Sequence, residues 1–264
     1  MKILFIGDIC GIASLQRKYL KQLYGIEGNV VQRVRYDLGG VSQFYKATMK
    51  GSSNSLKTYS ISQSLVHDVV HVHAYDTLVR WVKWLARKPI VLQYHGSDIR
   101  WRREEKRKYY KHADQIIVST PDLLEDMPEA TYLPNPVDTE LFVPRKKKFC
   151  LGTAFHFLYD ADDYAKEFTE TYSLSLVTHD RSVDPIPYYE MPQVLSKYEY
   201  YVDVRRSNGK IVECLSRTAL EALACGVKVI NWKGEVLVPP LPNEHNPEVS
   251  AEKLKKIYDG ILKK

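Results

Sequence analysis

The sequence has 264 residues, enough for one large or two modest domains, and 44% of them are hydrophobic, which supports a sizeable core. No apolar run approaches the roughly 20 residues that cross a membrane, and the charged start, Met1–Asp8, does not resemble a signal peptide. Four scattered cysteines without metal-site spacing favour a reducing, cytoplasmic environment over a disulfide scaffold.

The positive charge lies in the first half of the chain. Residues 1–148 carry 24 Lys and Arg against 15 Asp and Glu, whereas residues 149–264 carry 14 against 17. The cations gather in Arg100–Lys111, where aromatic residues interleave with them, and in Arg145–Lys148. A solvated helix face is the ordinary interpretation of such a run. Because aromatic rings suit a membrane interface and no nucleic-acid-binding module accompanies the run, we expect an anionic membrane surface, and not nucleic acid, as its partner, with the protein peripheral at the inner face.

The first 133 residues alternate between predicted strands and helices, which indicates a parallel sheet covered on both faces. Hydrophobic periodicity predicts strands at Lys2–Ile6, Asn29–Tyr36, Val66–His73, Pro89–Tyr94, Gln115–Ser119 and Ala130–Leu133. Helices are predicted at Ala13–Tyr24, Asp76–Lys88, Trp101–Lys111 and Pro121–Met127. In the second helix, Leu78, Trp81 and Leu85 have the spacing of one shared face.

Pro134–Asp138 interrupts this alternation and marks the exit from a first domain predicted to span 1–143. A smaller alternation follows in the predicted second domain, 149–242. Its strands are expected at Phe149–Phe155, Ser173–Thr178, Tyr198–Val204 and Val227–Asn231, and its helices at Met191–Ser196 and Thr218–Cys225. The remaining segment, 243–264, reads as an amphipathic helix that packs back on the first domain.

Polar motifs end two of the predicted strands of the first domain, at the edge of a parallel sheet where ligands bind. His71-Val-His73 has no third residue of matching spacing, so no metal site is expected, and His71 is interpreted as a core residue. His95 is followed by Gly96, which allows close backbone approach, so His95 is a candidate functional residue, while Asp98 suits a helix cap. The turn from Gly7 to Gly11 fits either an approaching phosphate or an ordinary tight turn.

Glu213 and Glu221 lie eight residues apart around a predicted helix start, with Ser216 or Thr218 as the cap. The unpaired N–H groups of a helix start suit a phosphate, and a carboxylate one turn into the helix can reach a ribose hydroxyl. Two alternatives remain open. Thr218 and Glu221 also fit a capping box, and Glu213 also fits an ordinary surface carboxylate.

Five segments occur together in an order that resembles family 4 retaining glycosyltransferases: Asp68–His73, Gln93–Asp98, Ala113–Thr120, Leu133–Asp138 and Glu213–Gly226. The resemblance implies an α/β fold of the GT-B class, with two facing Rossmann-like domains built on parallel sheets, the second of them reduced here. It implies a hexosyltransferase-like enzyme that moves a sugar from a UDP- or GDP-linked donor with retention of configuration. No metal and no cofactor other than the donor substrate is implied. The acceptor, lipid-linked or a glycan, would bind the first domain.

The resemblance also implies roles for individual residues. His95 and Glu213 would serve the reaction centre, and Glu221 would hold the nucleotide ribose. Main-chain N–H groups around Ser216, Arg217 and Thr218 would meet the diphosphate, with Gly11 approaching from the first domain.

The chain departs from the family pattern at the donor site. The Gly-Arg…Lys-Gly element that neutralises the diphosphate is missing, and Glu213-Cys-Leu-Ser216 lacks the two usual glycines. The substitutes available for the missing cations are Arg181, Arg205, Arg206, Lys210 and Arg217. The chain is also roughly 100 residues shorter than a usual two-domain enzyme of this class. A non-catalytic GT-B binding module and a nucleotide-sugar epimerase therefore stand as alternative functions.

Overall fold

The computed structural model describes residues 1–264 except 35–36, 146–149, 159–160 and 264. The chain forms two compact units: unit 1 is Met1–Pro136 together with Pro247–Lys264, and unit 2 is Val137–Asn246. The expected boundaries were 1–143 and 149–242, so the observed change of unit comes earlier, directly after Pro136. No helix in the described part of the chain is long and apolar enough to cross a membrane.

Unit 1 is built on a sheet of seven parallel strands in the order β3-β2-β1-β4-β5-β6-β7. The strands are β1 (Lys2–Ile6), β2 (Glu27–Arg33), β3 (Met49–Gly51), β4 (Val69–His73), β5 (Ile90–Tyr94), β6 (Gln115–Val118) and β7 (Thr131–Tyr132). Its helices are α1 (Ile12–Tyr24), α2 (Val41–Phe44), α3 (Ser53–Ser64), α4 (Val79–Ala86), α5 (Arg103–Tyr110), α6 (Leu123–Asp126) and α10 (Pro247–Leu262). The strand order reverses between β1 and β4, which is where doubly wound sheets bind ligands.

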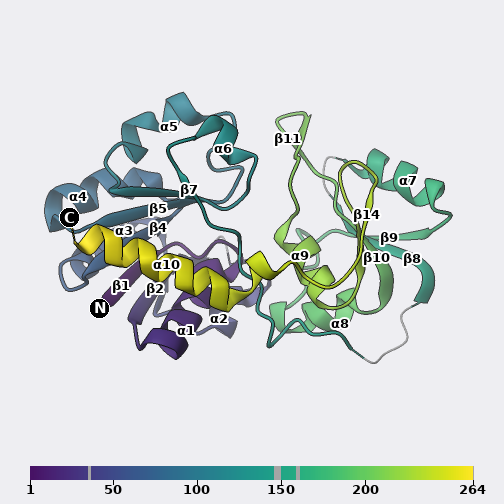
Figure 1. Ribbon diagram of the computed structural model, residues 1–264, viewed down its shortest axis with the longest axis horizontal. Helices are drawn as coiled ribbons and strands as arrows, with labels where there is room; N and C mark the ends of the chain where they lie inside the picture. Colours follow the sequence, from purple (N-terminus) through teal and green to yellow (C-terminus); the bar gives the residue numbers. More distant parts are fainter. Residues whose placement is uncertain (35–36, 146–149, 159–160, 264) are drawn as a thin grey trace. The chain divides into compact units, whose positions relative to one another are not determined.

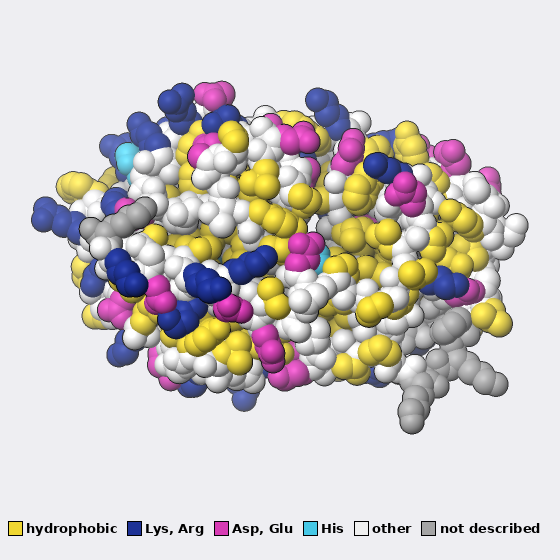
Figure 2. All heavy atoms as spheres, viewed as in Figure 1, with side chains coloured by type: hydrophobic (Ala, Val, Ile, Leu, Met, Phe, Trp, Pro, Cys, Tyr) yellow, Lys and Arg dark blue, Asp and Glu magenta, His cyan; other side chains and the backbone are white. Residues whose placement is uncertain are grey.

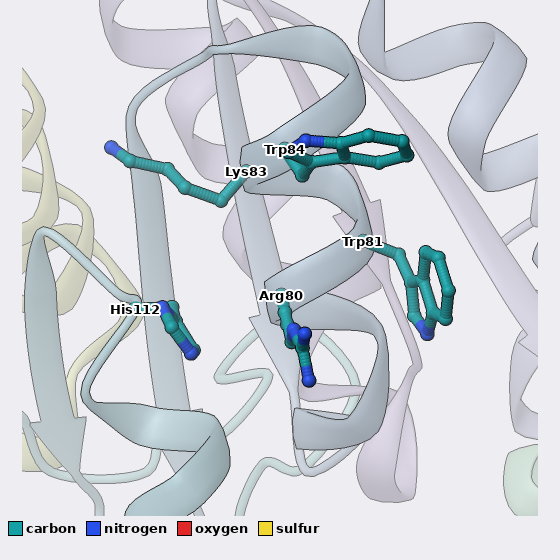
Figure 3. Close-up of a pocket in the computed structure, with 5 residues that line it drawn as sticks. All are labelled: Arg80, Trp81, Lys83, Trp84 and His112. Carbon is teal, nitrogen blue, oxygen red and sulfur yellow. The ribbon is translucent and has the colours of Figure 1, made fainter.

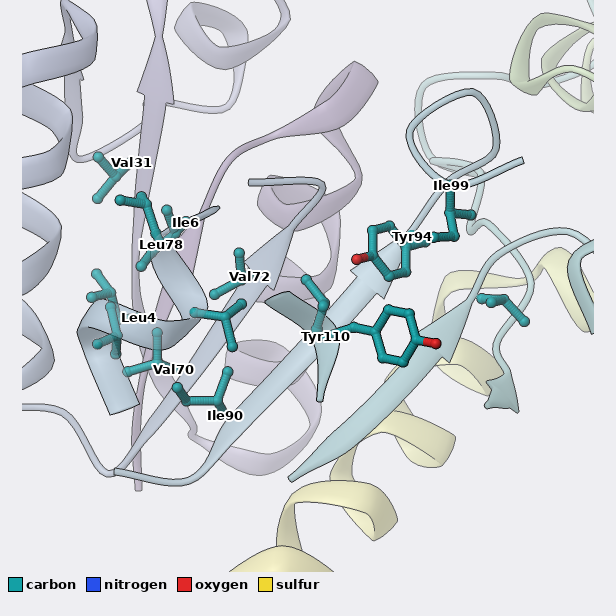
Figure 4. Packing of buried hydrophobic residues seen from close by; sticks show 14 of the residues in the cluster. Leu4, Ile6, Val31, Val70, Val72, Leu78, Ile90, Tyr94, Ile99 and Tyr110 are labelled. Atoms are coloured by element: carbon teal, nitrogen blue, oxygen red, sulfur yellow. The ribbon is translucent and has the colours of Figure 1, made fainter. Parts of the chain in front are cut away.

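Both faces of this sheet are covered, because successive side chains of a strand point to opposite sides. On one side, Leu4 and Ile6 of β1 pack in a cluster with side chains from α3, α4, α5 and α6 (Figure 4). On the other side, Ile3 and Phe5 pack with α1 and with Leu254 of α10. Figure 1 shows α10, the last element of the chain, running beside α1. The C-terminal helix thus completes the core of unit 1.

Helix α4 does not bury the face that its spacing suggested. It begins at Val79, while Leu78 lies in a preceding 3-10 turn, so the helical phase differs from the expected one. Val79 and Val82 form the buried face, and Trp81 and Leu85 are 46% and 44% exposed. The predicted shared face of Leu78, Trp81 and Leu85 was therefore wrong.

Unit 2 contains a five-stranded sheet in the order β14-β13-β10-β8-β9, in which only β14 is antiparallel to its neighbour. The strands are β8 (Cys150–Phe157), β9 (Ser175–His179), β10 (Tyr198–Val202), β13 (Lys228–Ile230) and β14 (Val236–Leu237). The helices are α7 (Asp162–Thr171), α8 (Met191–Leu195) and α9 (Arg217–Ala224), and a hairpin joins β11 (Arg206–Ser207) to β12 (Lys210–Ile211). The order reverses between β8 and β10, so the carboxyl end of β10 lies at the switch point.

Candidate functional site

His95 stands directly after β5, at the ligand-binding edge of the sheet of unit 1, and is half-buried. Its Nε2 lies 3.0 Å from His73 Nδ1, and the two rings stack. Its Nδ1 lies 3.1 Å from Ser119 Oγ and 3.4 Å from Asn135 Oδ1. The structure thus brings residues from the ends of three neighbouring strands, and Asn135 beyond the fourth, around one imidazole.

A chain of hydrogen bonds determines which ring nitrogen of His95 carries the proton. Gln16 Nε2 donates to Gln93 Oε1 (3.1 Å), and Gln93 Nε2 donates to Ser119 Oγ (2.8 Å). Since Ser119 Oγ already accepts that proton, its own hydroxyl is best used as a donor to His95 Nδ1. Ser119 Oγ, at 3.1 Å, is a closer partner of Nδ1 than Asn135 Oδ1, at 3.4 Å, so His95 is assigned, from this network, as the tautomer that carries its proton on Nε2 and donates it to His73.

The two histidines of β4 are buried and neutral. Burial, and then the charge of His95, lower the pKa of His71 to about 3. Burial, followed by the neighbouring histidines, also holds the pKa of His73 well below its usual value. His71 Nδ1 lies 2.7 Å from the hydroxyl of Tyr258 in the core, which agrees with its interpretation as a core residue. Within the described residues, no cluster of three or more His, Cys, Asp or Glu could hold a metal ion.

Asp98 closes the loop after β5 and does not cap the next helix. Its carboxylate accepts hydrogen bonds from the backbone N–H of His95 (3.0 Å) and of Gly96 (2.8 Å), whereas α5 begins at Arg103. The expectation of a helix cap was therefore wrong. Burial raises the pKa of Asp98 to about 6, against the lowering effect of these N–H groups. Gly96 has a φ of 138°, in the region that favours glycine, so this loop conformation depends on it.

Other residues of unit 1 pack tightly against the turn from Gly7 to Gly11. A Cβ on Gly7 would lie 2.6 Å from the carbonyl oxygen of His73, and one on Gly11 would lie 2.3 Å from Val41 Cγ1. Both glycines have positive φ angles, and Gly11 is the N-cap of α1. Protein packing thus accounts for both glycines, so the approach of Gly11 to a diphosphate stays a prediction.

A cavity of about 300 Å³ opens beside this turn at the carboxyl ends of the strands. Its lining combines cations, an aromatic ring and a carboxylate: Ile9, Arg33, Ala74, Tyr75, Asp76, Thr77 and Lys106. Lys106 Nζ lies 2.9 Å from Asp76 Oδ2, and the hydroxyl of Tyr94 also donates to that carboxylate. The cavity therefore offers fixed polar groups on the acceptor-side unit of the predicted fold.

In unit 2, α9 begins at the carboxyl end of β10. Ser216 is its N-cap, and its Oγ accepts the backbone N–H of Ala219 at 3.0 Å. Buried Asp203, the residue after β10, accepts the N–H of Ser216 at 2.7 Å and ties the helix start to the sheet. Because Ser216 is the cap, Thr218 lies inside the helix, and the alternative capping box of Thr218 and Glu221 was wrong.

Glu221 is buried and charge-paired. Arg217 Nε donates to Glu221 Oε1 at 2.9 Å, and Arg217 Nη2 donates to the hydroxyl of Tyr188 at 2.8 Å. That hydroxyl lies 3.4 Å from the same carboxylate oxygen. Burial raises the pKa of Glu221, while the charges of Arg217 and Arg181 oppose the rise. Glu213, in contrast, is exposed between β12 and α9 and forms no hydrogen bond or ion pair within the described residues, so the structure does not join it to this cluster.

Apart from Lys210, which is exposed on β12, the cations proposed as substitutes for the missing basic element fall into two groups. Arg206 pairs with exposed Asp163 (2.9 Å), and Arg205 donates to the carbonyl of Cys214 (2.7 Å). Arg217 and Arg181 instead act on the buried carboxylate of Glu221. Arg217, in contact with Glu221, and Arg205, which also lies 3.5 Å from Asp203 Oδ1, are thus the cations at the start of α9, and Arg181 acts on Glu221 only at longer range.

Sequence reasoning missed several members of both clusters. Gln93, Ser119 and Asp203 each lie in or directly after an apolar strand, which is a signal that sequence carries. Gln16 and Tyr188 carry no such signal, because only the fold brings them to Gln93 and Glu221.

Comparisons with known proteins bear on the fold of the chain. Residues 18–141 match the family model of Glycosyltransferase Family 4. Among solved structures, an α-glucosyltransferase in complex with UDP has a TM-score of 0.61 and 14% identity, over 99% of this chain and 92% of that chain. HepE from Anabaena in complex with UDP has a TM-score of 0.56 and 12% identity, over 98% and 91%. A UDP-GlcNAc 2-epimerase from Neisseria meningitidis bound to UDP-GlcNAc has a TM-score of 0.50 and 14% identity, over 99% and 94%.

At these identities the structural matches establish the fold alone. No curated protein sequence matches this chain. The family model and the solved structures together confirm the predicted resemblance to family 4 glycosyltransferases and the predicted GT-B class of fold.

Proposed function

We propose that the protein is a glycosyltransferase that moves a sugar from a UDP-sugar to an acceptor hydroxyl with retention of configuration. The observation that carries the proposal is the buried group of Glu221, Arg217 and Tyr188 at the start of α9, at the switch point of unit 2. It combines a carboxylate for a ribose with a cation, Arg217, for a diphosphate. UDP is favoured over GDP because two similar structures are complexes with UDP.

Sugar transfer requires that this chain stabilise the leaving diphosphate and position the acceptor hydroxyl. Negative charge develops on the leaving diphosphate and would be stabilised by Arg181, Arg217 and the N–H groups of the first turn of α9. These cations make a metal ion unnecessary at the donor. On unit 1, the acceptor would bind at the carboxyl ends of the strands, where His95 stands and the cavity beside Gly7 opens, so that its hydroxyl is positioned for transfer to the anomeric carbon.

The first test is binding followed by turnover. The protein is titrated with UDP and GDP by calorimetry, and UDP release from UDP-glucose and UDP-GlcNAc is then measured with and without EDTA. The proposal expects tighter binding of UDP and release that EDTA does not abolish. Loss of all activity with EDTA, restored by a divalent cation, would contradict metal independence.

The second candidate, a nucleotide-sugar epimerase, is favoured by the likeness to the UDP-GlcNAc 2-epimerase. NMR of the reaction mixture separates the three functions. A transferase yields UDP and a new glycoside of defined anomeric configuration. An epimerase yields the C2 epimer, and a binding module yields neither while still binding UDP. An inverted anomeric centre in the product would overturn retention.

A further inference from the structure

The outer side of α4 carries tryptophans and cations but no carboxylate. Trp84 is 70% exposed, and Trp81 and Leu85 are also largely exposed. From Val79 to Ala86 the helix contains no Asp or Glu, and Arg87 and Lys88 follow it. Because Val79 and Val82 already supply the buried face, the tryptophans are not needed for the core of unit 1.

These side chains border a groove of about 400 Å³ on the surface of unit 1. Its lining is Arg80, Trp81, Lys83, Trp84 and His112, the last from the end of the α5 segment (Figure 3). The indole rings of Trp81 and Trp84 lie edge to face, with their centroids 6.4 Å apart. Lys57 Nζ of the neighbouring α3 lies 5.2 Å from the centroid of the Trp81 ring. The surface therefore mixes flat aromatic area with positive charge.

The charge on this surface is available to a partner. In the described part of the chain, Lys57, Arg80, Arg87 and Lys88 take part in no ion pair, whereas Lys83 binds Asp114. The basic stretch along α5 differs, although Figure 2 shows Lys and Arg gathered over it. Its cations are mostly neutralised by carboxylates: Arg100 by Asp122, Arg102 by Glu105, Arg103 by Glu129, Lys106 by Asp76 and Arg107 by Glu104.

We propose that the outer side of α4, defined by Arg80, Trp81, Trp84, Leu85 and Lys88, is a docking surface for a membrane that contains anionic lipids. Indole rings partition to the level of lipid head groups, where a polar edge and an apolar body are both satisfied. Unpaired cations beside them complement anionic head groups, and the attraction fades with salt.

Exposed aliphatic side chains favour a membrane over a nucleic acid as the partner of this surface. Leu85 at the end of α4, and Leu65 and Val66 after α3, are exposed, and α3 packs beside α4. Such side chains gain from contact with lipid but offer no flat face to stack on a base. The surface thus fits a lipid interface better than a nucleic acid, and it is a different place from the α5 stretch expected from sequence.

The experiment is co-sedimentation of the full chain with vesicles of neutral phosphatidylcholine, with and without phosphatidylglycerol, at low and high salt. Three variants are compared: Trp81→Ala with Trp84→Ala, Arg80→Gln with Lys88→Gln, and, as the matched control on α5, Lys108→Gln with Lys111→Gln. Lys108 and Lys111 also take part in no ion pair among the described residues, so the control removes equal charge. Far-UV circular dichroism and the melting temperature check that each variant is folded.

The proposal expects binding to anionic vesicles only, lost at high salt. Each cation removed from the docking surface should weaken binding roughly fivefold. The tryptophan variant should weaken binding at least tenfold, with the control close to wild type. Equal loss from the α5 control, equal binding to neutral vesicles, or no binding at all would overturn it. Competition by duplex DNA that depends on Trp81 and Trp84 would replace it with a nucleic-acid surface. If the double tryptophan variant does not fold, Trp84→Ala alone decides, because that side chain is the more exposed.

Discussion

At the scale of single residues, Glu221 is held in a buried ion pair, and this changes what its substitution should do. Glu221→Gln leaves Arg217 buried without its anion, and breaking such a pair costs about 3–5 kcal/mol of unfolding free energy. If Glu221 also holds the ribose, UDP affinity should fall on the order of ten- to a hundredfold, since a charge-assisted hydrogen bond is lost. Urea unfolding and calorimetry measure the two effects.

Glu167→Gln, at an exposed position of α7, is the matched control and should change neither quantity. A Glu221→Gln protein that is less stable but binds UDP as tightly as wild type would make Glu221 purely structural. The sequence alone did not predict that Glu221 contacts Arg217 and Tyr188.

The hydrogen-bond chain around His95 makes a prediction that needs no substrate. Ser119→Ala removes the hydroxyl assigned as donor to His95 Nδ1, so His95 should lose its preference for the tautomer protonated on Nε2. The ¹⁵N chemical shifts of the imidazole, measured by NMR, report the tautomer directly. Wild-type shifts in the Ser119→Ala protein, or a wild-type protein protonated on Nδ1, would contradict the assignment. Ser62→Ala, at an exposed hydroxyl of α3, serves as the control.

The raised pKa of Asp98 predicts how the free energy of unfolding depends on pH. Its pKa is about 6 in the folded chain and about 3.9 in an unfolded one, so the folded state binds a proton more tightly between these values. Stability from this group is then complete below pH 4 and is lost as the pH rises through 6, by on the order of 3 kcal/mol. Urea unfolding of wild type and Asp98→Asn at pH 5, 6 and 7 measures it. The difference in unfolding free energy between the two proteins should shift in favour of wild type on acidification; a pH-independent difference would exclude Asp98 as the titrating group.

At the scale of elements, α10 acts as part of the core of unit 1 although it comes from the far end of the chain. Leu254 is fully buried against the α1 face of the sheet. Leu254→Ala should therefore lower the free energy of unfolding by about 2–5 kcal/mol, the usual cost of truncating a buried leucine. Lys256→Ala, which removes only an exposed pair with Glu252, should stay within about 0.5 kcal/mol of wild type. Urea denaturation followed by circular dichroism compares them; equal effects would mean that α10 is not packed as described.

Six of the seven strands of unit 1 were predictable, because buried parallel strands form short, apolar, β-branched runs between turn residues. β3 (Met49–Gly51), which is not fully buried, and α3 (Ser53–Ser64) were missed. β1 was predicted with its observed bounds, Lys2–Ile6. Helix α7 was missed, because Asp162, Asp163 and Glu167 dominate its sequence and only a narrow apolar face, with Ala165, is buried.

The β11–β12 hairpin was also missed, although its turn carries a sequence signal. Asn208 and Gly209 both have positive φ angles, at 51° and 75°, as a tight two-residue hairpin turn requires.

The candidate sites were predictable only in part, for a physical reason. His95 and Glu221 follow from local pattern, a polar residue at a strand end and a carboxylate in a capped helix. Their partners depend on packing between distant segments: Gln16 reaches Gln93, and Tyr188 reaches Glu221, only once the sheets have formed. The exposure of Trp81 likewise depends on where α4 starts, which periodicity does not fix.

At the scale of the whole molecule, each of the two units has its own sheet and its own core, and the proposed function places the nucleotide on unit 2. A ligand that binds only the folded state stabilises it by about 2.7 kcal/mol at a concentration of 100 times its Kd. UDP should therefore slow amide hydrogen exchange in β10, α9 and β13 of unit 2. It should leave β1, β4 and α10 at the rates of the free protein.

Exchange followed by mass spectrometry at peptide resolution measures this, with GDP and inorganic phosphate as matched ligands. Protection by UDP that appears in α9 supports the site around Glu221, whereas protection confined to the Gly7–Gly11 turn would move the nucleotide to unit 1 and remove the basis of the donor assignment. Equal protection by phosphate alone would mean that only an anion, and not the nucleoside, is recognised.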